Sequence, residues 1–512
     1  MEIQRQRSDS FYLSSRLHLT AAFVSLTTGA AIAVGLCARG NYRDAAVITA
    51  MSLGIAFVFS GAVTLETVML AWFVTTPVAS FYLRYPLDRS IITYDRLIFF
   101  LLLLLMLIGT RSIFFDSFPD VRAKSQEAAF SLTKFELAWA LLSILALASG
   151  FLHSNNLAYS VRIAVDAFWL PLFAFYFARR YFSMRNSGRM LVIGCIALAM
   201  FLFVNGSYEV ATGVDLFQYK GAELVREGER RVNGPFLSDS SFAIICLLLF
   251  VILQAAPRLI RLRFDRSGKL IYFVATVCAG LGALLSAFRV VAMAIFICWI
   301  GQIWLEHRTT GKLFWKSTSI RRRLLPAAAI GIILVLFGGW FVLRAAPALG
   351  ARLIDPRSAF GRLATWQAAT IIAFENPLFG VGLGNYADYF DQSHYYSDEE
   401  PEEVLETKAA NSPHSNLLWI ASELGFPGLV LYIAANVFLF LIGWRGLKAA
   451  ADRQQVVAYS CYIALVLAYW ISGLTLASGY YSDLNLYFLF FLGALSAQFR
   501  KQIHLPPVSN YI

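Results

Sequence analysis

Apolar runs of about 17–25 residues recur along this chain and leave few ways for it to fold. As an α-helix, a run of this length crosses a hydrocarbon core about 30 Å thick with every backbone hydrogen bond made internally. The 512 residues are 58% hydrophobic and 15% charged, whereas a soluble domain carries about 25% charged residues. Because the runs are too long and unbroken for barrel strands, we predict an all-α polytopic membrane protein.

Fourteen runs are candidate spans, but two neighbouring pairs are poorly separated, so we expect 12–14 transmembrane helices. The candidate spans lie near residues 17–37, 45–63, 65–83, 96–110, 135–152, 161–178, 189–206, 240–256, 270–287, 290–305, 326–343, 416–443, 456–477 and 484–499.

Basic residues set the direction of the spans. The net charge of +11 comes largely from arginine and lysine in short loops, and such loops face the cytoplasm, so the charge does not indicate nucleic-acid binding. Counting from a cytoplasmic tail at 1–16 places the basic loops 257–269 and 306–325, and the tail 500–512, on the same side. We predict that both termini are cytoplasmic and that the first run is a retained span, not a cleaved signal peptide.

The long loops then fall on the outer side. The first, 206–240, lies within a transmembrane region at 17–343, and the second, 344–415, precedes the C-terminal transmembrane helices at 416–499. Long loops in compact proteins usually carry function or are disordered. The acidic run at 397–406 is a lid, a surface that repels anions, or simply solvated charge.

Three arginines stand out near the outer face. Arg289 lies between two apolar runs and is either functional or an arginine that snorkels to the interface. Arg231 lies in a basic stretch on the outer side, against the charge rule, and is otherwise a solvated loop residue. Arg362 opens a helical pattern that predicts an amphipathic surface helix anchored by Trp366. The apolar positions of that helix are Leu363, Trp366, Ala369 and Ile372 or Ala373.

A glycine-rich stretch, "NPLFGVGLGNY" (376–386), follows that helix. A dinucleotide fingerprint needs G-x-G-x-x-G between a strand and a helix, and neither the spacing nor the context holds here. We predict a tight turn.

His414 precedes the apolar run that begins at 416, with Ser412 and Ser415 nearby as caps. The positive end of a helix dipole disfavours an imidazolium, so the ring would stay neutral and could accept a proton from a hydroxyl. The alternative is a capping or interface histidine.

Together these residues place three arginines and one histidine on the same predicted face. Guanidinium groups bind phosphate oxygens in a bidentate manner. Arginines that neutralise a leaving group, beside a histidine that activates a hydroxyl, suit chemistry on a lipid diphosphate.

The cysteines lie in or at the ends of apolar runs and form no C-x-x-C pair, so we predict packing residues, with no disulfide, metal site or cofactor. They are Cys37, Cys195, Cys246, Cys278, Cys298 and Cys461.

Read in order, four segments resemble the O-antigen ligase and O-antigen polymerase superfamily of bacterial envelope enzymes. They are "RVNGPF" (231–236), "SAFR" (286–289), "GRLATWQAATIIAFENPLFGVGLGNY" (361–386) and "PHSNLLWIASELGFPGLVLY" (413–432). The last two are the most specific, since a loop ending in NPLFGVGLGNY, then a histidine and E-L-G-x-P-G, is close to a family signature. The resemblance covers roughly residues 160–445.

The resemblance implies an inverting, metal-independent glycosyltransferase with a GT-C-like fold in the bacterial inner membrane, active at the periplasmic face. It would move an undecaprenyl-diphosphate-linked glycan onto a glycan or lipid A-core acceptor. By the same resemblance, His414 activates the acceptor hydroxyl and Arg231 and Arg289 hold the diphosphate. Arg362 matches a loop arginine whose role is less settled.

The family does not separate polymerases from ligases easily by sequence. The chain length and the long outer loop slightly favour a polymerase for exopolysaccharide or O-antigen. The alternative is a transporter or flippase of an anionic or lipid-linked solute, but we find no internal repeat, and the charges gather at one face rather than mid-span. A non-catalytic scaffold would leave the arginines and histidine unexplained. Participation of a chain-length regulator stays open.

Overall fold

The computed structural model describes residues 65–85, 92–111, 132–182, 184–217, 232–236, 238–260, 265–286, 288–309, 357–392 and 413–497. Several predictions from the sequence fall outside these residues: Arg231, Cys37, Ser412, the acidic run at 397–406, and the spans near 17–37, 45–63 and 326–343.

The chain divides into two compact units at Thr133. In the first unit, α3 (Leu65–Tyr82) and α4 (Tyr94–Arg111) are joined through a short antiparallel hairpin of β1 (Arg84–Tyr85) and β2 (Ile92–Thr93). The indole nitrogen of Trp72 donates to Asp95 Oδ1 at 2.7 Å, which holds α3 against the start of α4.

The second unit contains the candidate site. Its elements are α6 (Lys134–His153), α7 (Leu157–Ile163), a π-helical segment η2 (Ala164–Trp169), α8 (Leu170–Tyr181), α9 (Met184–Thr212), α10 (Asp239–Leu259), α11 (Arg266–Leu285), α12 (Arg289–Thr309), α15 (Arg357–Glu375), α16 (Tyr386–Gln392), α18 (Asn416–Ala449), α19 (Arg453–Gly473), a 3₁₀ turn η4 (Ser478–Tyr480) and α20 (Ser482–Ala497).

Eight helices among the described residues are long and apolar enough to cross a membrane. All belong to the second unit, and they coincide with predicted spans to within a few residues at most ends. The prediction of an all-α polytopic membrane protein is confirmed.

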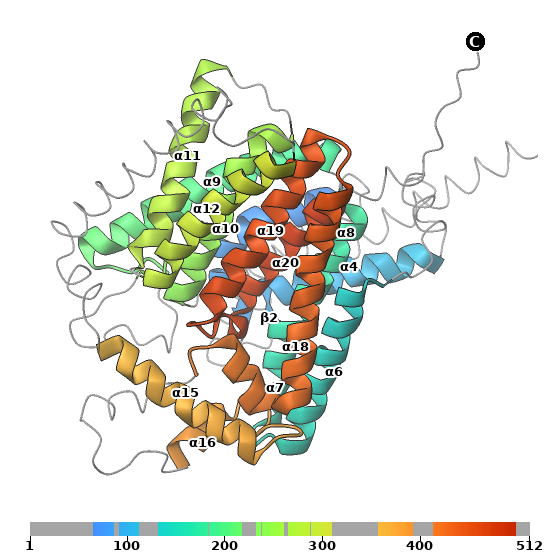
Figure 1. The fold of residues 1–512 in the computed structure, drawn as a ribbon, viewed down its shortest axis with the longest axis vertical. Coiled ribbons are helices and arrows are strands. Elements are labelled where there is room, and N and C mark those ends of the chain that lie inside the picture. The colour runs from blue at the N-terminus through green and yellow to red at the C-terminus, as the bar shows by residue number, and fades with distance from the viewer. Residues whose placement is uncertain are drawn as a thin grey trace, which may run out of the picture. The chain divides into compact units, whose positions relative to one another are not determined.

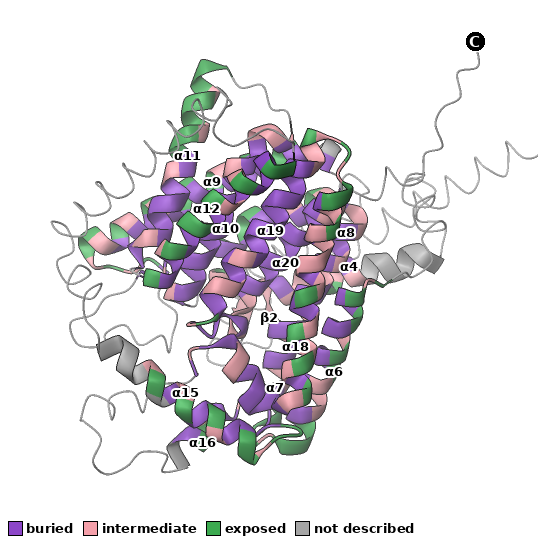
Figure 2. Cartoon of the chain, viewed as in Figure 1, coloured by how far each residue is buried: buried purple, intermediate pink, exposed green. Residues whose placement is uncertain are grey.

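The core of the second unit lies along α10 and α19 (Figures 1 and 2). These helices pack against one another, and α10 also packs on α9, α11, α12 and α20. A helix that is apolar on every side must be covered on every side, and 83% of the apolar window of each is buried. The five described cysteines are buried within these helices and their neighbours, as packing residues should be.

Chain direction gives the second unit two distinct ends. At one end, which we call the site end, α6, α9, α11 and α19 finish while α7, α10, α12 and α20 begin. The opposite end, the basic end, carries most of the described lysines and arginines. These include Lys134, Arg179, Arg180, Arg258, Arg266, Lys269, Arg308, Lys448 and Arg453.

Two ion pairs, one buried and one with a partly exposed arginine, connect helices at the basic end. Arg179 on α8 lies 2.7 Å from Glu136 on α6, and Arg258 on α10 lies 2.9 Å from Glu306 on α12. Glu136 also accepts from the backbone and hydroxyl of Thr133 in a capping box. Removing one partner of such a pair leaves an uncompensated charge, so these contacts fix which helices are neighbours.

The structure differs from the predicted span at 416–443, because α18 is two helical segments joined at Gly425 (φ 70°, ψ −172°). The Asn416 side chain hydrogen-bonds with Tyr432. In a continuous helix these residues would be about 24 Å apart, at about 1.5 Å per residue. The segment 416–424 therefore folds back along the start of 426–449, and the second segment alone is long enough to span.

Candidate functional site

His414 lies just before this helical hairpin. Ser415 occupies the N-cap position of α18, but its side chain makes no capping hydrogen bond, contrary to the predicted cap. His414 itself has φ +48° and is the one non-glycine residue with positive φ in the described part of the chain. Its side chain is partly exposed. Because the first segment of α18 folds back, His414 lies near the level of Tyr432, and Gly425 forms the tip of the hairpin.

Asn416 fastens this segment to the turn between α19 and α20. Its Oδ1 accepts from the backbone nitrogen of Gly479 at 2.7 Å, and its Nδ2 donates to Ser478 Oγ at 3.0 Å. A side chain at Gly479 would place a Cβ 2.6 Å from the Trp419 ring, so only glycine fits at this contact.

Glu423 is fully buried and is the centre of a hydrogen-bond network. Its Oε2 accepts from Trp419 Nε1 at 2.7 Å and from the Gly384 nitrogen at 2.9 Å. Its Oε1 accepts from the Tyr386 nitrogen at 3.3 Å and from the Tyr480 hydroxyl. One carboxylate thus joins α18, the glycine-rich turn and η4, which satisfies a charge that would otherwise be costly to bury.

The glycine-rich stretch 376–386 is a tight turn, as predicted, and it wraps around the end of the first α18 segment. The Val381 and Gly382 nitrogens donate to the carbonyls of Ser422 and Glu423 at 2.9 and 3.2 Å, and the Phe426 nitrogen donates to the Pro377 carbonyl at 2.8 Å. From the other side, Ser160 on α7 donates to the Leu383 carbonyl at 2.5 Å.

Glycine is required where this turn meets the hairpin. Gly380 has φ +64°, and a Cβ there would lie 2.3 Å from the backbone of Glu423. Gly425 has φ +70°, and a Cβ there would lie 2.7 Å from the backbone of Pro377 and Leu378. The glycines of "NPLFGVGLGNY" and "ELGFPG" therefore allow two backbones to touch, which side chains would prevent.

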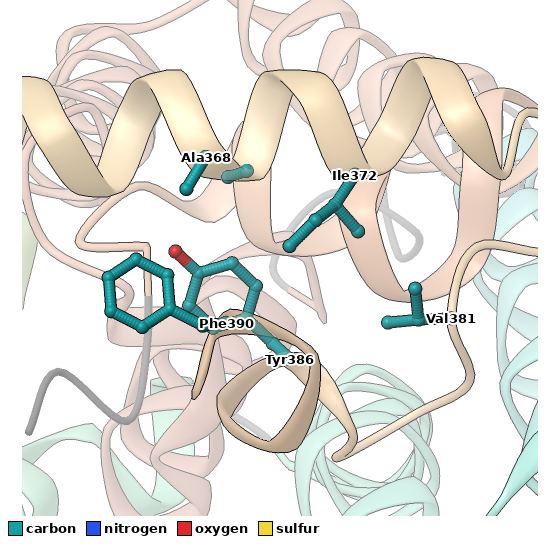
Figure 3. Close-up of a cluster of buried hydrophobic side chains, with 6 residues drawn as sticks. Ala368, Ile372, Val381, Tyr386 and Phe390 are labelled. Carbon is teal, nitrogen blue, oxygen red and sulfur yellow. The ribbon is translucent and has the colours of Figure 1, made fainter. Parts of the chain in front are cut away.

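Arg362 lies on α15, which packs on α18. The buried face of α15 meets Tyr386 and Phe390 of α16 (Figure 3), and Leu418 of α18 packs against the same cluster. The Tyr386 hydroxyl donates to the Thr365 carbonyl at 3.1 Å. Of the predicted apolar positions, Ala369, Ile372 and Ala373 are buried, but Leu363 is 56% exposed. The buried face of the helix includes Thr365 and Ala368 in place of Leu363.

Arg289 is the first residue of α12 and is exposed, just after the turn that joins α11 to α12 at the site end. The segment after Arg231 lies beside that turn, since Ser286 Oγ donates to the Val232 carbonyl at 3.2 Å. Glu209 on α9 holds the same segment by accepting from the Asn233 and Gly234 nitrogens at 3.2 and 3.0 Å. Ser238 caps the start of α10, since its side chain accepts from the Ser241 nitrogen at 3.1 Å.

Sequence reasoning missed Glu423, Glu209 and Tyr480 as residues that build this end. A signal was available for two of them, because a lone carboxylate in or beside an apolar run is costly unless it has partners. The role of Tyr480 depends on a contact between residues 57 positions apart, which no local pattern reveals. Among the described residues, no group of three or more His, Cys, Asp or Glu could hold a metal ion.

These features define a polytopic α-helical membrane protein with a polar, arginine- and histidine-bearing end built on a broken helix. A family model described as O-antigen ligase matches residues 235–433. This match supports the resemblance to the O-antigen ligase/polymerase superfamily over these residues. The family implies glycosyltransferase-like ligase or polymerase activity. No curated protein compared with the chain matches it.

The matched region contains Arg289, Arg362, His414 and Glu423, and it ends just after Tyr432. Both sides of the contact between the glycine-rich turn and the α18 hairpin therefore lie within the domain. Arg231 and η4 lie outside it.

Proposed function

We propose that the protein transfers an undecaprenyl-diphosphate-linked glycan onto a hydroxyl acceptor, as an exopolysaccharide or O-antigen polymerase or as an O-antigen ligase. The acceptor oxygen would attack the anomeric carbon while the bond from that carbon to the diphosphate oxygen breaks. His414 would take the hydroxyl proton, and the lipid diphosphate would leave with inversion, without a metal.

The backbone of His414 is the observation that carries this proposal. A left-handed conformation costs a residue with a side chain roughly 1–2 kcal/mol, and such conformations cluster at functional sites. Here it falls on a partly exposed histidine ahead of a segment fixed by Asn416, Trp419 and Glu423. A ring held by rigid surroundings is suited to general base catalysis.

Arg289 supports recognition of an anion. It is exposed at the first position of α12, where the helix dipole disfavours a cation by about 0.3–1 kcal/mol. A bound diphosphate would reverse that effect, and the guanidinium could bind it in a bidentate manner. The contact between Ser286 and Val232 supports a second contribution from Arg231, and the packing of α15 on α18 supports one from Arg362.

The distribution of charge supports a periplasmic site and cytoplasmic termini. Loops rich in lysine and arginine stay in the cytoplasm, and the described lysines and arginines are concentrated at the basic end. The site end would then face the periplasm, where lipid-linked glycans are used.

The test is glycan transfer by the purified protein in lipid nanodiscs, with an undecaprenyl-diphosphate-linked glycan given with and without a lipid A-core acceptor. A ladder formed without the acceptor indicates a polymerase, and a shifted acceptor band indicates a ligase. His414→Ala should abolish either product while the protein still inserts and purifies normally. Full activity of that variant would contradict the role of His414, and absence of product with the wild-type protein would favour transport.

A further inference from the structure

The turn between α19 and α20 places two adjacent tyrosines against two different helix starts. Tyr480 ends η4, and Tyr481 is the residue before α20. Their side chains contact α18 and α10 respectively, so this short turn lies between the helix that follows His414 and the helix that follows the Arg231 segment.

Tyr480 contacts the first segment of α18. Its hydroxyl donates to Glu423 Oε1. Its ring centroid lies 4.4 Å from that of Trp419, which itself donates to the same carboxylate. The tyrosine therefore touches this segment twice, by ring packing and by a hydrogen bond to a fully buried carboxyl group.

Tyr481 contacts the start of α10. Its side chain hydrogen-bonds with Ser238 and Ser240, and Ser238 is the N-cap of that helix. Gly234, four residues earlier, belongs to the segment that Glu209 holds. The carbonyl of Val232 in turn meets Ser286, three residues before Arg289. Hydrogen bonds, together with short stretches of chain, thus connect Tyr481 to the start of α12.

The turn that carries the tyrosines is itself fixed. The Gly479 nitrogen donates to Asn416 Oδ1 at 2.7 Å, and its carbonyl accepts from Asn485 Nδ2 at 2.7 Å. Asn485 also accepts from the Tyr469 hydroxyl at 2.8 Å. Because both the backbone nitrogen and the carbonyl of Gly479 are hydrogen-bonded, this residue cannot shift without breaking buried hydrogen bonds.

We propose that Tyr480 and Tyr481 are positioning residues that together fix the helix following His414 against the starts of α10 and α12, and so set the spacing between His414 and Arg289. This inference rests on the proposed function, since it concerns the same transfer site. Neither tyrosine needs to touch substrate in this role.

The test combines a distance with turnover. Cysteines placed at Val214 and Leu378, which are 49% and 65% exposed, carry spin labels in a protein whose native cysteines are replaced. Val214 follows α9, and Leu378 adjoins the α18 hairpin, so the labels report on the two sides that the tyrosines join. Tyr480→Phe, Tyr481→Phe and the double variant keep the rings and remove the hydroxyls.

Tyr462→Phe is the matched control. Tyr462 is fully buried on α19, and its hydroxyl has no hydrogen-bond partner among the described residues. Loss of that hydroxyl should leave the distance and the turnover unchanged, whereas a general effect of removing a buried tyrosine hydroxyl would appear here too.

We expect the double variant to broaden or shift the Val214–Leu378 distance distribution. Its kcat should fall about tenfold, with KM for the lipid-linked glycan within about twofold of wild type, as expected when alignment and not binding is lost. Its melting temperature should fall below that of Tyr462→Phe, because the buried Glu423 carboxyl group loses a donor, but the protein should remain folded at the assay temperature. An unchanged distribution would overturn the proposal, and so would a changed distribution with wild-type kcat. If the wild-type protein makes no product, the proposed function fails, and the distance distributions alone then decide whether the tyrosines hold the helix starts together.

Discussion

At the scale of the residue, the left-handed backbone of His414 predicts that a glycine variant is more stable than an alanine variant, which reverses the usual order in helices. At an ordinary helical position, glycine is about 0.5–1 kcal/mol less stable than alanine. At φ +48° alanine meets the steric penalty that glycine avoids. We therefore expect His414→Gly to be more stable than His414→Ala by about 1 kcal/mol, measured by thermal unfolding in detergent, while both variants lose transfer.

Gln367 gives the matched comparison, since it is exposed on α15. At this position Gln367→Gly should be less stable than Gln367→Ala. The same order at both positions would mean that His414 is not held in this conformation in solution.

Tyr481 predicts a loss of stability at high pH. Burial, followed by the nearby Asp239 and Asp483 carboxylates, raises its pKa to about 12, although hydrogen bonds from Ser238 and Ser240 act the other way. The protonated tyrosine is therefore favoured in the folded protein, and its contribution is complete below pH 10, the ordinary pKa. The contribution is lost as the pH rises from 10 to 12. The melting temperature of wild type should fall more steeply over this interval than that of Tyr481→Phe, and parallel curves would contradict the shift.

Single residues also show which features of the site could be predicted from the sequence and which could not. Arg289 could be placed at the turn between two helices because two apolar runs meet beside it, and α12 begins at this residue. The buried role of Glu423 needed four donors from three separate segments, Gly384 and Tyr386 among them. A sequence reports the cost of burying a carboxylate, but only the fold supplies its partners.

At the scale of the element, the break in α18 predicts that Gly425 cannot be replaced. Its φ and ψ lie in a region that is essentially restricted to glycine, and a Cβ would meet the backbone of Pro377 at 2.7 Å. We expect Gly425→Ala to cost at least about 2–3 kcal/mol of stability and to lower transfer. Gly301→Ala on α12 is the control, because a Cβ there meets nothing within 4 Å. It should be neutral or slightly stabilising, and equal tolerance at both positions would contradict a fixed reversal at Gly425.

Hydropathy could not have found this break. Both α18 segments are apolar, so a sliding window joins them into one run, and Pro427 alone is compatible with a kink as well as with a new start. The glycine-rich turn was predicted as a turn, but not as the partner of this break. The reversal is stabilised by contacts with residues 377–386, about 40 positions earlier in the chain, and such contacts have no local signal.

At the scale of the whole molecule, the concentration of basic residues at one end of the second unit predicts its orientation. Single cysteines at Val214 and Ala451 lie at opposite ends, and both positions are exposed in loops. Because lysine- and arginine-rich loops are retained in the cytoplasm, a membrane-impermeant maleimide should label Val214→Cys in intact spheroplasts. Ala451→Cys should be labelled only after the membrane is opened. The native cysteines described in the structure are buried, so the protein without added cysteines gives the background labelling.

Labelling of Ala451→Cys in intact spheroplasts would reverse the orientation and place the site end, with His414 and Arg289, in the cytoplasm. A transferase that uses periplasmic lipid-linked glycans could not work from that side, so this one measurement tests the membrane topology and the proposed function together.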